Sequence, residues 1–160
     1  MPRYHMHKAE AAITDEAAIQ AILAAGKYAT LAFARHGEPY LATMNYGYDP
    51  NARALYCHSA PHGLKLEFMR ENPQVCGTVI IDDGYVPNRC SHAYRSVVFW
   101  GRVEFLETPE EKAYGLGVLI DCLEPDPAAT RAKLLSDPGR LSNVTVLRIM
   151  IDEVSGRMGK

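Results

Sequence analysis

Three strand-like segments follow one another between residues 28 and 60 with only short turns between them. They read "YATLAFAR", "YLATMNYGYD" and "ALYCHSA", and the turns fall at "HGEP" and around Pro50 and Asn51. A parallel pair of strands needs a crossover connection of a dozen or more residues, so such short turns favour antiparallel neighbours. The pattern therefore predicts an antiparallel meander over this part of the chain.

Three more strands are predicted beyond the meander, at 74–82, 95–107 and 144–157. A polar loop is expected over 83–94, and Gly101 inside the long segment "RSVVFWGRVEFLE" predicts a bulge or a close approach. A parallel sheet would need a helix after nearly every strand. Six strands with a few helices at the periphery instead indicate a mainly β fold, a closed antiparallel barrel with flanking helices.

Four helices are expected around the strands, over 15–25, over 63–72, over 109–122 and within 124–139. Thr14 is a candidate cap for the first helix, and Gly26 could end it in a left-handed conformation. In the second helix the apolar spacing points Leu64, Phe68 and Met69 inward.

Length and net charge indicate a single domain and favour no particular class of partner. The 160 residues, 48% of them hydrophobic, suit a single domain over 1–160 with residues 1–12 flexible. Lys and Arg number 17 against 19 Asp and Glu, a net charge of −2, which favours neither nucleic acid nor an anionic membrane. The sequence has no apolar run long enough to span a bilayer and no secretory signal, so a cytoplasmic protein is expected.

The sequence contains no motif typical of a metal site or of a redox-active dithiol. The four cysteines, Cys57, Cys76, Cys90 and Cys122, form no C-x-x-C pair. His5 and His7 could be read as a metal pair, but no carboxylate pattern accompanies them. We therefore expect no metal site.

The stretch "YCHSAPHGLKLEFMREN" gathers polar groups where a strand ends and a helix begins. His58 and Ser59 end the strand, and Lys65 lies in the first helical turn, whose free N–H groups suit a phosphate. Each residue also has a purely structural reading: Lys65 as a solvated charge, Ser59 as a helix cap and His58 as a strand-end histidine. Spacing alone does not choose between a phosphate site and these readings.

Polar residues on two other strands could face a heterocycle. Thr43 and Asn45 share one face of a strand that is otherwise suited to burial, and buried polar groups need partners. Arg95, Ser96 and Trp100 bring a cation, a hydroxyl and an indole to the start of the long strand. The alternatives are that Thr43 and Asn45 pair across the sheet and that Trp100 belongs to the core or an interface.

Three co-linear motifs carry a resemblance to a known family. "YATLAFARHGEPYLATMNYGYD", "LYCHSAPHGLKLEFMRENPQVC" and "CSHAYRSVVFWGRVEFLETPEEK" resemble the pyridoxamine 5′-phosphate oxidase-like, FMN-binding split-barrel superfamily, and within it the 5-nitroimidazole-resistance branch. The resemblance implies a six-stranded antiparallel split β-barrel that forms a homodimer, with FMN in two clefts at the subunit interface.

The resemblance also assigns site residues by position. It implies that Thr43, Asn45 and Tyr46 line the flavin ring, that Lys65 contacts the phosphate, and that the cleft is completed by His58, Ser59, Arg95, Ser96 and Trp100. One departure is Leu64, where that branch commonly has arginine or histidine in "GRK" or "GHK". The phosphate grip would then depend more heavily on Lys65.

The first functional hypothesis is an FMN-dependent oxidoreductase that reduces a small electrophile, such as a nitroaromatic, with NAD(P)H and with His58 as proton donor. No G-x-G-x-x-G fingerprint is present, so the nicotinamide would bind transiently. The C-terminus lacks the basic run that true pyridoxine-phosphate oxidases use for substrate, which argues against vitamin B6 oxidation. The alternative is a module that binds flavin (FMN or FAD) or haem without turnover, with His58 as an axial haem ligand.

A homodimer is expected on physical grounds as well. Phe99, Trp100, Tyr46 and Tyr48 make more large apolar surface than a small barrel can cover alone.

Overall fold

The computed structural model describes residues 7–159, and most of its regular structure is strand. The strands are β1 (Ala12–Ile13), β2 (Tyr28–Arg35), β3 (Glu38–Asn45), β4 (Gly47–Asp49), β5 (Ala54–Ser59), β6 (Gln74–Val86), β7 (Ser91–Leu106) and β8 (Thr145–Gly159). All of their pairings are antiparallel. The predicted mainly β, antiparallel fold is therefore confirmed.

The sheet is a split barrel. Its two edge strands, β3 and β4, are joined by the chain and not by hydrogen bonds. Its strand order is β3-β2-β6-β7-β8-β5-β4, with β1 added beside β8. The expected single strand at 40–49 is divided at Tyr46, so β3 lies at one end of this order and β4 at the other. The predictions of a closed barrel and of an unbroken meander are therefore wrong. The divided strand and the additional β1 bring the number of strands within residues 7–159 to eight, where six were predicted.

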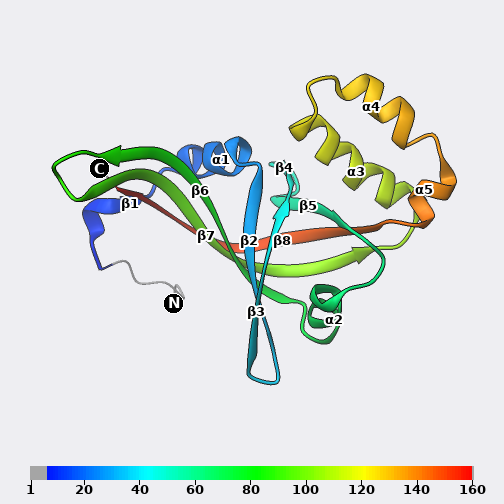
Figure 1. The fold of residues 1–160 in the computed structure, drawn as a ribbon, viewed down its shortest axis with the longest axis horizontal. Helices are drawn as coiled ribbons and strands as arrows, with labels where there is room; N and C mark the ends of the chain where they lie inside the picture. The colour runs from blue at the N-terminus through cyan, green and yellow to red at the C-terminus, as the bar shows by residue number, and fades with distance from the viewer. Residues whose placement is uncertain (1–6, 160) are drawn as a thin grey trace.

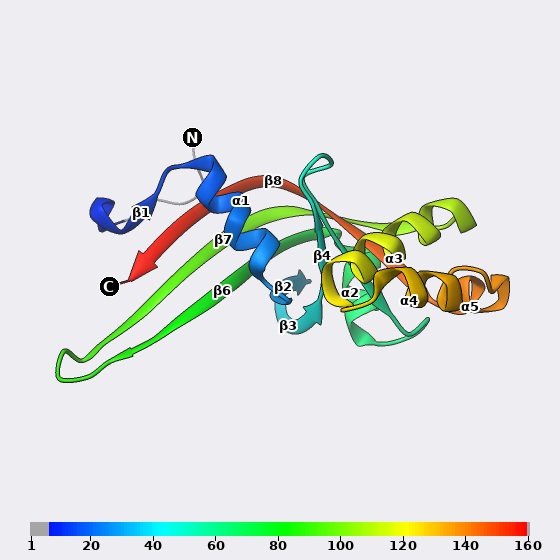
Figure 2. The ribbon, with the colours of Figure 1, turned by 90° about the horizontal axis from the view of Figure 1, so that it is seen from above.

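Within residues 7–159, five helices flank the sheet (Figure 1). They are α1 (Glu16–Ala25), α2 (Leu64–Glu71), α3 (Pro109–Leu123), α4 (Pro127–Leu134) and α5 (Pro138–Ser142), preceded by a 3-10 turn at Ala9–Ala11. Helices α3, α4 and α5 gather at one end of the molecule, opposite the long β6–β7 hairpin (Figures 1 and 2). The Pro-rich segment therefore holds two helices where one was expected.

Helix ends depart from the predictions in small ways. Asp15 rather than Thr14 caps α1, because its carboxylate accepts the Ala18 N–H at 3.0 Å. Gly26 follows α1 in extended backbone with φ −67°, not in the left-handed region. In α2 the inward residues are Leu66, Phe68 and Met69, whereas Leu64 at the first position is exposed.

The segment predicted as a polar loop, 83–94, is mostly strand. β6 and β7 stay paired out to Val86 and Ser91, with a register shift between Asp82 and Gly84. This outer hairpin reaches beyond the rest of the sheet (Figure 2) and its residues lack a core to face. A two-stranded ribbon of that kind carries polar side chains on both faces, and this is why its sequence reads as a loop.

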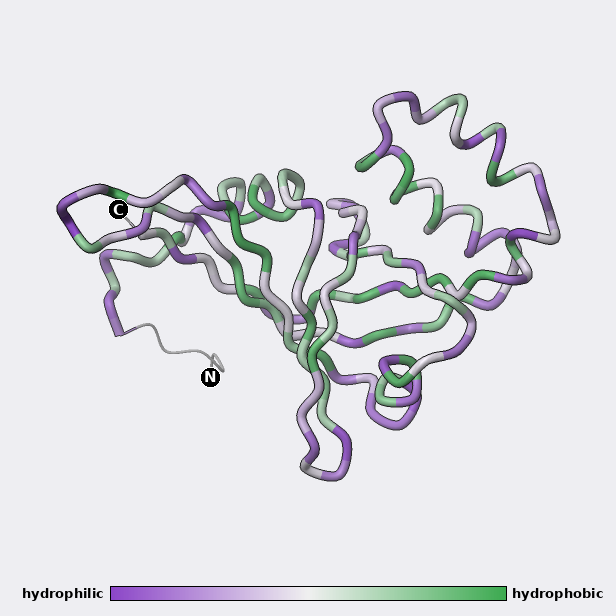
Figure 3. Tube along the Cα trace, in the orientation of Figure 1, coloured by the Kyte–Doolittle hydropathy of each residue, from purple (hydrophilic) through white to green (hydrophobic). Residues whose placement is uncertain are grey.

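The core lies between the sheet and α1 and α2. Val97, Phe99 and Val103 of β7 point inward in alternation and pack with residues such as Leu31 and Leu147. A second cluster under α3 consists of Ala54, Tyr56, Leu106 and Val146. Hydrophobic residues concentrate where the strands cross near the centre, and the tip of the β2–β3 hairpin is hydrophilic (Figure 3).

Three of the cysteines differ in exposure. Cys57 is fully buried, Cys76 is half-buried and Cys90 is exposed. Of the N-terminal segment 1–12, residues 1–6 lie outside the described part of the chain. Within that part, no helix is long and apolar enough to cross a membrane.

At Gly101 the backbone of β7 comes close to that of β8, as predicted. A register shift follows Trp100, and a Cβ at Gly101 would lie 2.1 Å from the carbonyl oxygen of Met150 on β8. We expect Gly101→Ala to lower the free energy of unfolding by about 1–3 kcal/mol, because backbone must move to admit the methyl group. Urea denaturation measures this. Gly139→Ala is the control, since its nearest neighbour is the end of the Asp137 side chain at 3.2 Å, and equal stabilities of the two variants would contradict the prediction.

Candidate functional site

The junction between β5 and α2 holds a buried hydroxyl with no partner. Ser59 is 6% exposed, and its Oγ makes no hydrogen bond with any described residue. Four residues later Gly63 is the N-cap of α2, and it provides no side chain to cap the first-turn N–H groups. A buried polar atom without a partner is costly, and uncapped helix N–H groups favour an anion. The junction therefore fits a phosphate group.

Lys65 supplies the positive charge at this junction. Its side chain is half-buried in the first turn of α2. Burial raises the pKa of the Cys57 thiol in β5 to about 12, and the charge of Lys65 opposes that rise. Within residues 7–159 the Lys65 ammonium makes no ion pair with a carboxylate.

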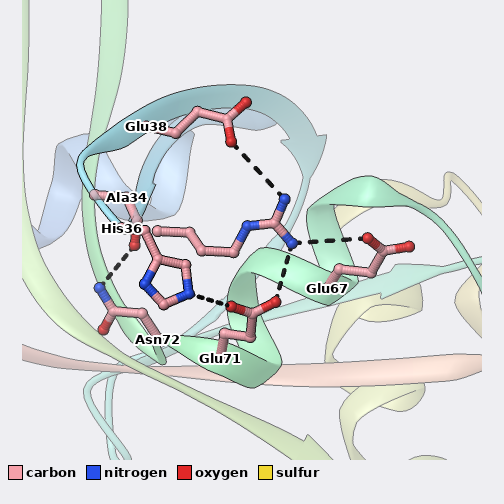
Figure 4. Close-up of polar contacts among 7 residues, drawn as sticks. Ala34, His36, Glu38, Glu67, Glu71 and Asn72 are labelled. Atoms are coloured by element: carbon pink, nitrogen blue, oxygen red, sulfur yellow. Dashed lines mark hydrogen bonds and ion pairs between the residues drawn. The ribbon is translucent and has the colours of Figure 1, made fainter.

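A polar network fixes α2 against the β2–β3 hairpin. Arg35 donates to Glu71 at 3.0 Å, lies 3.8 Å from Glu67, and stacks over the Phe68 ring at 4.4 Å. Figure 4 shows His36 reaching Glu71 from the same hairpin. Together with the burial of Phe68 in the core, these contacts hold α2, and with it Lys65, against the β2–β3 hairpin.

Thr43 and Asn45 lie on the outer face of the sheet. Both are exposed, which corrects the expectation of a buried strand face. Thr43 shares a 3.0 Å hydrogen bond with Thr30, its cross-strand partner, and the Asn45 amide donates to the Lys27 carbonyl at 3.0 Å. The cross-strand alternative is confirmed for Thr43, although exposed side chains of this kind can also contact a ligand.

Ser96 and Trp100 share this outer face, and Arg95 does not. Cross-strand partners lie on the same face of a sheet. The pairings Thr43–Thr30–Thr78–Val98 form one row across four strands, with Ser96 and Trp100 on either side of Val98. β3 and β7 are three strand spacings apart, a distance of roughly 14 Å. The β3 side chains Thr43 and Asn45 therefore do not touch the β7 side chains within one subunit.

Arg95 is held away from the other candidate residues. It points to the opposite face of β7 from Ser96, and its guanidinium pairs bidentately with Asp83 at 2.9 Å for both hydrogen bonds. That pair lowers the pKa of Asp83.

The side chain of Tyr46 belongs to the core. It is 1% exposed, and its hydroxyl donates to the Leu23 carbonyl of α1 at 2.6 Å. Burial raises the pKa of this phenol well above its usual range. Only the backbone of Tyr46 remains available to a ligand.

His58 lies on the other side of β5 from Ser59. Adjacent residues of a strand point to opposite faces, and Leu55 and Cys57 join the main core while Tyr56 joins the cluster under α3. The His58 side chain borders a cavity formed with α3, α4 and α5. The structure thus places Ser59 and Lys65 at the two ends of the β5–α2 junction and turns His58 to the opposite face of β5.

Sequence reasoning missed the apolar residues of the outer face. Tyr28, Leu41 and Ile80 are 60%, 64% and 57% exposed. On the outer face, Tyr28 is two residues from Thr30, Leu41 two residues from Thr43, and Ile80 two residues from Thr78. The alternation in "YATLAFAR" already indicates an outward-facing row, because Tyr28 and Thr30 alternate with buried residues. Conversely Phe99, Tyr46 and Tyr48 are buried in the subunit's own core, which corrects their assignment to an uncovered surface.

Among residues 7–159, no group of three or more His, Cys, Asp or Glu side chains is arranged to hold a metal ion. His5 lies outside this range, and His7 is exposed.

Comparisons with known proteins agree on the fold. Residues 15–158 match the family described as pyridoxamine 5′-phosphate oxidase. An uncharacterised protein of Rhizobium meliloti is 37% identical over 87 residues, which are 54% of this chain and 52% of that protein. The chain thus aligns with about half the length of this curated relative.

Solved structures cover nearly the whole chain. A candidate 5-nitroimidazole antibiotic resistance protein of Bacteroides thetaiotaomicron has a TM-score of 0.76 and 26% identity, covering 98% of this chain and 96% of its own. An FAD-binding protein of Mesorhizobium loti has a TM-score of 0.64 and 28% identity, with coverage of 91% and 96%. An FAD- and haem-binding protein of Mycobacterium smegmatis has a TM-score of 0.79 at 21% identity, with coverage of 93% and 73%, and indicates the fold alone.

The family match spans the sheet, the β5–α2 junction and the outer face. The resemblance predicted from the three sequence motifs is therefore confirmed, and the chain belongs to the pyridoxamine 5′-phosphate oxidase family.

Proposed function

We propose that this protein is an FMN-dependent oxidoreductase that uses NAD(P)H to reduce a small electrophile such as a nitroaromatic compound. The observation that carries the proposal is the unpartnered Ser59 hydroxyl beside the uncapped start of α2 and the Lys65 ammonium. A hydroxyl, free N–H groups and an ammonium group are the donors that a phosphate monoester needs. In this proposal Ser59 and Lys65 hold the cofactor phosphate.

The outer face of the sheet would receive the flavin ring. Thr43, Asn45 and the backbone of Tyr46 offer hydroxyl, amide and peptide groups at one edge. Ser96 and Trp100 lie too far away in the same subunit, so we assign them to the ring bound mainly by the partner subunit. This division requires a homodimer, with Tyr28, Leu41 and Ile80 covered at the interface.

Bound in this way, FMN would supply two-electron transfer between donor and acceptor. Reduction of a nitro group to a nitroso group by NAD(P)H and one proton yields NAD(P)⁺ and water. The acceptor must therefore receive protons, and an imidazole can donate one near neutral pH. His58 is the candidate donor because it borders a cavity one residue from the phosphate site.

Two similar proteins support a flavin cofactor and a nitro-containing acceptor. The Mesorhizobium protein is described as FAD-binding, and the Bacteroides protein as a candidate 5-nitroimidazole resistance protein. Their identities of 28% and 26% extend over more than nine tenths of this chain. Titration with FMN and with FAD identifies which flavin this chain prefers.

Lys65→Ala tests the phosphate site. We expect FMN binding to weaken by about 1.5–3 kcal/mol, the usual scale for a charge-assisted hydrogen bond, and riboflavin binding to change little. Flavin fluorescence quenching measures both affinities, and Lys133→Ala on α4 is the matched control. Equal loss of riboflavin and FMN would show that Lys65 does not bind the phosphate.

His58→Ala tests the proton donor. The variant should keep its flavin spectrum while the turnover of nitroaromatic acceptors per bound flavin falls about 10²–10⁴-fold. His62→Ala, which removes an exposed imidazole from the neighbouring loop, should behave as wild type. A proportional loss of flavin and stability would mean that His58 is structural. A wild-type protein that binds flavin but turns over with neither nicotinamide would favour the binding module.

Ile80→Asp tests the homodimer. The substitution places a charge among the exposed apolar side chains of the outer face, so we expect a monomer in light scattering and weaker FMN binding. Ala132→Asp adds the same charge to an exposed position of α4 and should leave both properties unchanged. A wild-type monomer with tight FMN binding is incompatible with the proposed arrangement.

A further inference from the structure

We propose that a cavity between the outer β6–β7 hairpin and the end of β8 binds the phosphate groups of the nicotinamide donor. This inference rests on the proposed function, in which NAD(P)H reduces the bound flavin. The end of β8 lies beside the hairpin, where Gly159 pairs with Tyr94 (Figure 1). The cavity has a volume of about 560 Å³, and the 3-10 turn at Ala9–Ala11 contributes to its wall.

Arg157 of β8 lines this cavity and lacks a partner for its charge. Its Nε atom is buried without a hydrogen bond. Within residues 7–159 the guanidinium forms no ion pair with a carboxylate. Burial of part of a guanidinium without a partner is costly, and an anion that accepts two hydrogen bonds from the group offsets this cost. Phosphate is such an anion.

The other charged groups around the cavity leave it positive. Lys8 adds a second, exposed cation, and Glu10 is the one carboxylate among the described residues of the wall. Asp82 does not line the cavity, and its Oδ1 lies 2.6 Å from Nε2 of His92, which does. Two cations, Lys8 and Arg157, therefore face a single acidic residue in the wall, and this balance favours an anionic ligand.

The cavity lies on the face of the sheet that would receive the flavin ring. Arg157 is the cross-strand partner of Ser96. His92 and Tyr94 precede Ser96 at alternate positions of β7 and therefore share its face. The outer face thus continues from the cavity to Ser96 and Trp100, which we assigned to the ring bound mainly by the partner subunit. No strand separates the cavity from that ring.

Size and chemistry point to the donor rather than to the acceptor. A volume of about 560 Å³ lies within the usual 300–1,000 Å³ of small-molecule sites and is more than one phosphate needs. A nitroaromatic acceptor carries no phosphate, whereas NAD(P)H carries a pyrophosphate that one ribose separates from the nicotinamide. With the pyrophosphate at Arg157, the nicotinamide would reach toward Ser96, one strand spacing of about 4.8 Å away.

The first measurement is the binding of NAD⁺ to the FMN-loaded protein by isothermal titration calorimetry. We expect Arg157→Gln to raise the Kd of NAD⁺ about tenfold or more, the scale of one charge-assisted hydrogen bond, and to leave the Kd of FMN unchanged. Glu10→Gln removes the opposing charge and should lower the Kd of NAD⁺ about twofold, a gain that a folding defect cannot produce. Arg89→Gln removes an exposed cation of the same hairpin outside the cavity and should match wild type.

The second measurement compares two hydride donors by the bleaching of the bound flavin. 1-Benzyl-1,4-dihydronicotinamide transfers the same hydride as NAD(P)H but has no phosphate. At donor concentrations below saturation, Arg157→Gln should slow reduction by NAD(P)H about tenfold and leave reduction by the benzyl analogue unchanged. A variant that is merely misfolded would slow both reactions.

Three contrary outcomes are distinguishable. Normal NAD⁺ binding by Arg157→Gln, or equal slowing with both donors, would overturn the inference and leave the proposed function standing. A rise in the Kd of FMN in this variant comparable to that of NAD⁺ would assign the cavity to the flavin and also overturn the inference. Wild-type protein whose FMN is reduced neither by NAD(P)H nor by the benzyl analogue would refute the proposed function and, with it, the role of the cavity.

Discussion

The crossing of the chain at Tyr46 is the constraint on which the rest of the architecture depends. β3 lies at one end of the strand order and β4 at the other, and only Tyr46 separates them in the sequence. The peptide backbone therefore joins the two ends that hydrogen bonds leave apart. The Tyr46 side chain stabilises the crossing, because its buried hydroxyl donates to the Leu23 carbonyl, and Gly26 leaves room for that hydroxyl. A bulkier residue at Gly26 would displace the phenol.

Both halves of the candidate site follow from this crossing. On its β3 side, Thr43 and Asn45 lie on the outer face, and the row of Thr43 continues through β2 and β6 to β7. On its β4 side, the chain turns into β5, whose pairing with β8 carries Ser59 to the start of α2. The Arg35 contacts then tie α2 to the hairpin that precedes the crossing. The phosphate site and the outer face are thereby positioned by one continuous stretch of chain.

Sequence patterns predicted the elements better than their spatial relations. The β5–α2 junction was predicted because strand alternation, a Pro-His-Gly turn and a helix start are local signals. The crossing was not, since alternation continues through Tyr46 and nothing local separates β3 from β4. The outer β6–β7 hairpin was read as a loop because it has no core to impose alternation. The placement of Leu66 rather than Leu64 depended on how α2 sits against β2, which is a tertiary contact.

The opposite directions of His58 and Ser59 show how a single strand can serve two environments. Ser59 faces the interior, where an unpaired hydroxyl requires a polar partner, whereas His58 faces an aliphatic cavity. The polar side of the strand end is built from the sheet and α2, whose positions are fixed by the core. The apolar side is built largely from α3, α4 and α5, which contribute little to that core. Substitutions in these helices can therefore reshape the cavity without disturbing the phosphate site, because the two share only the backbone of β5.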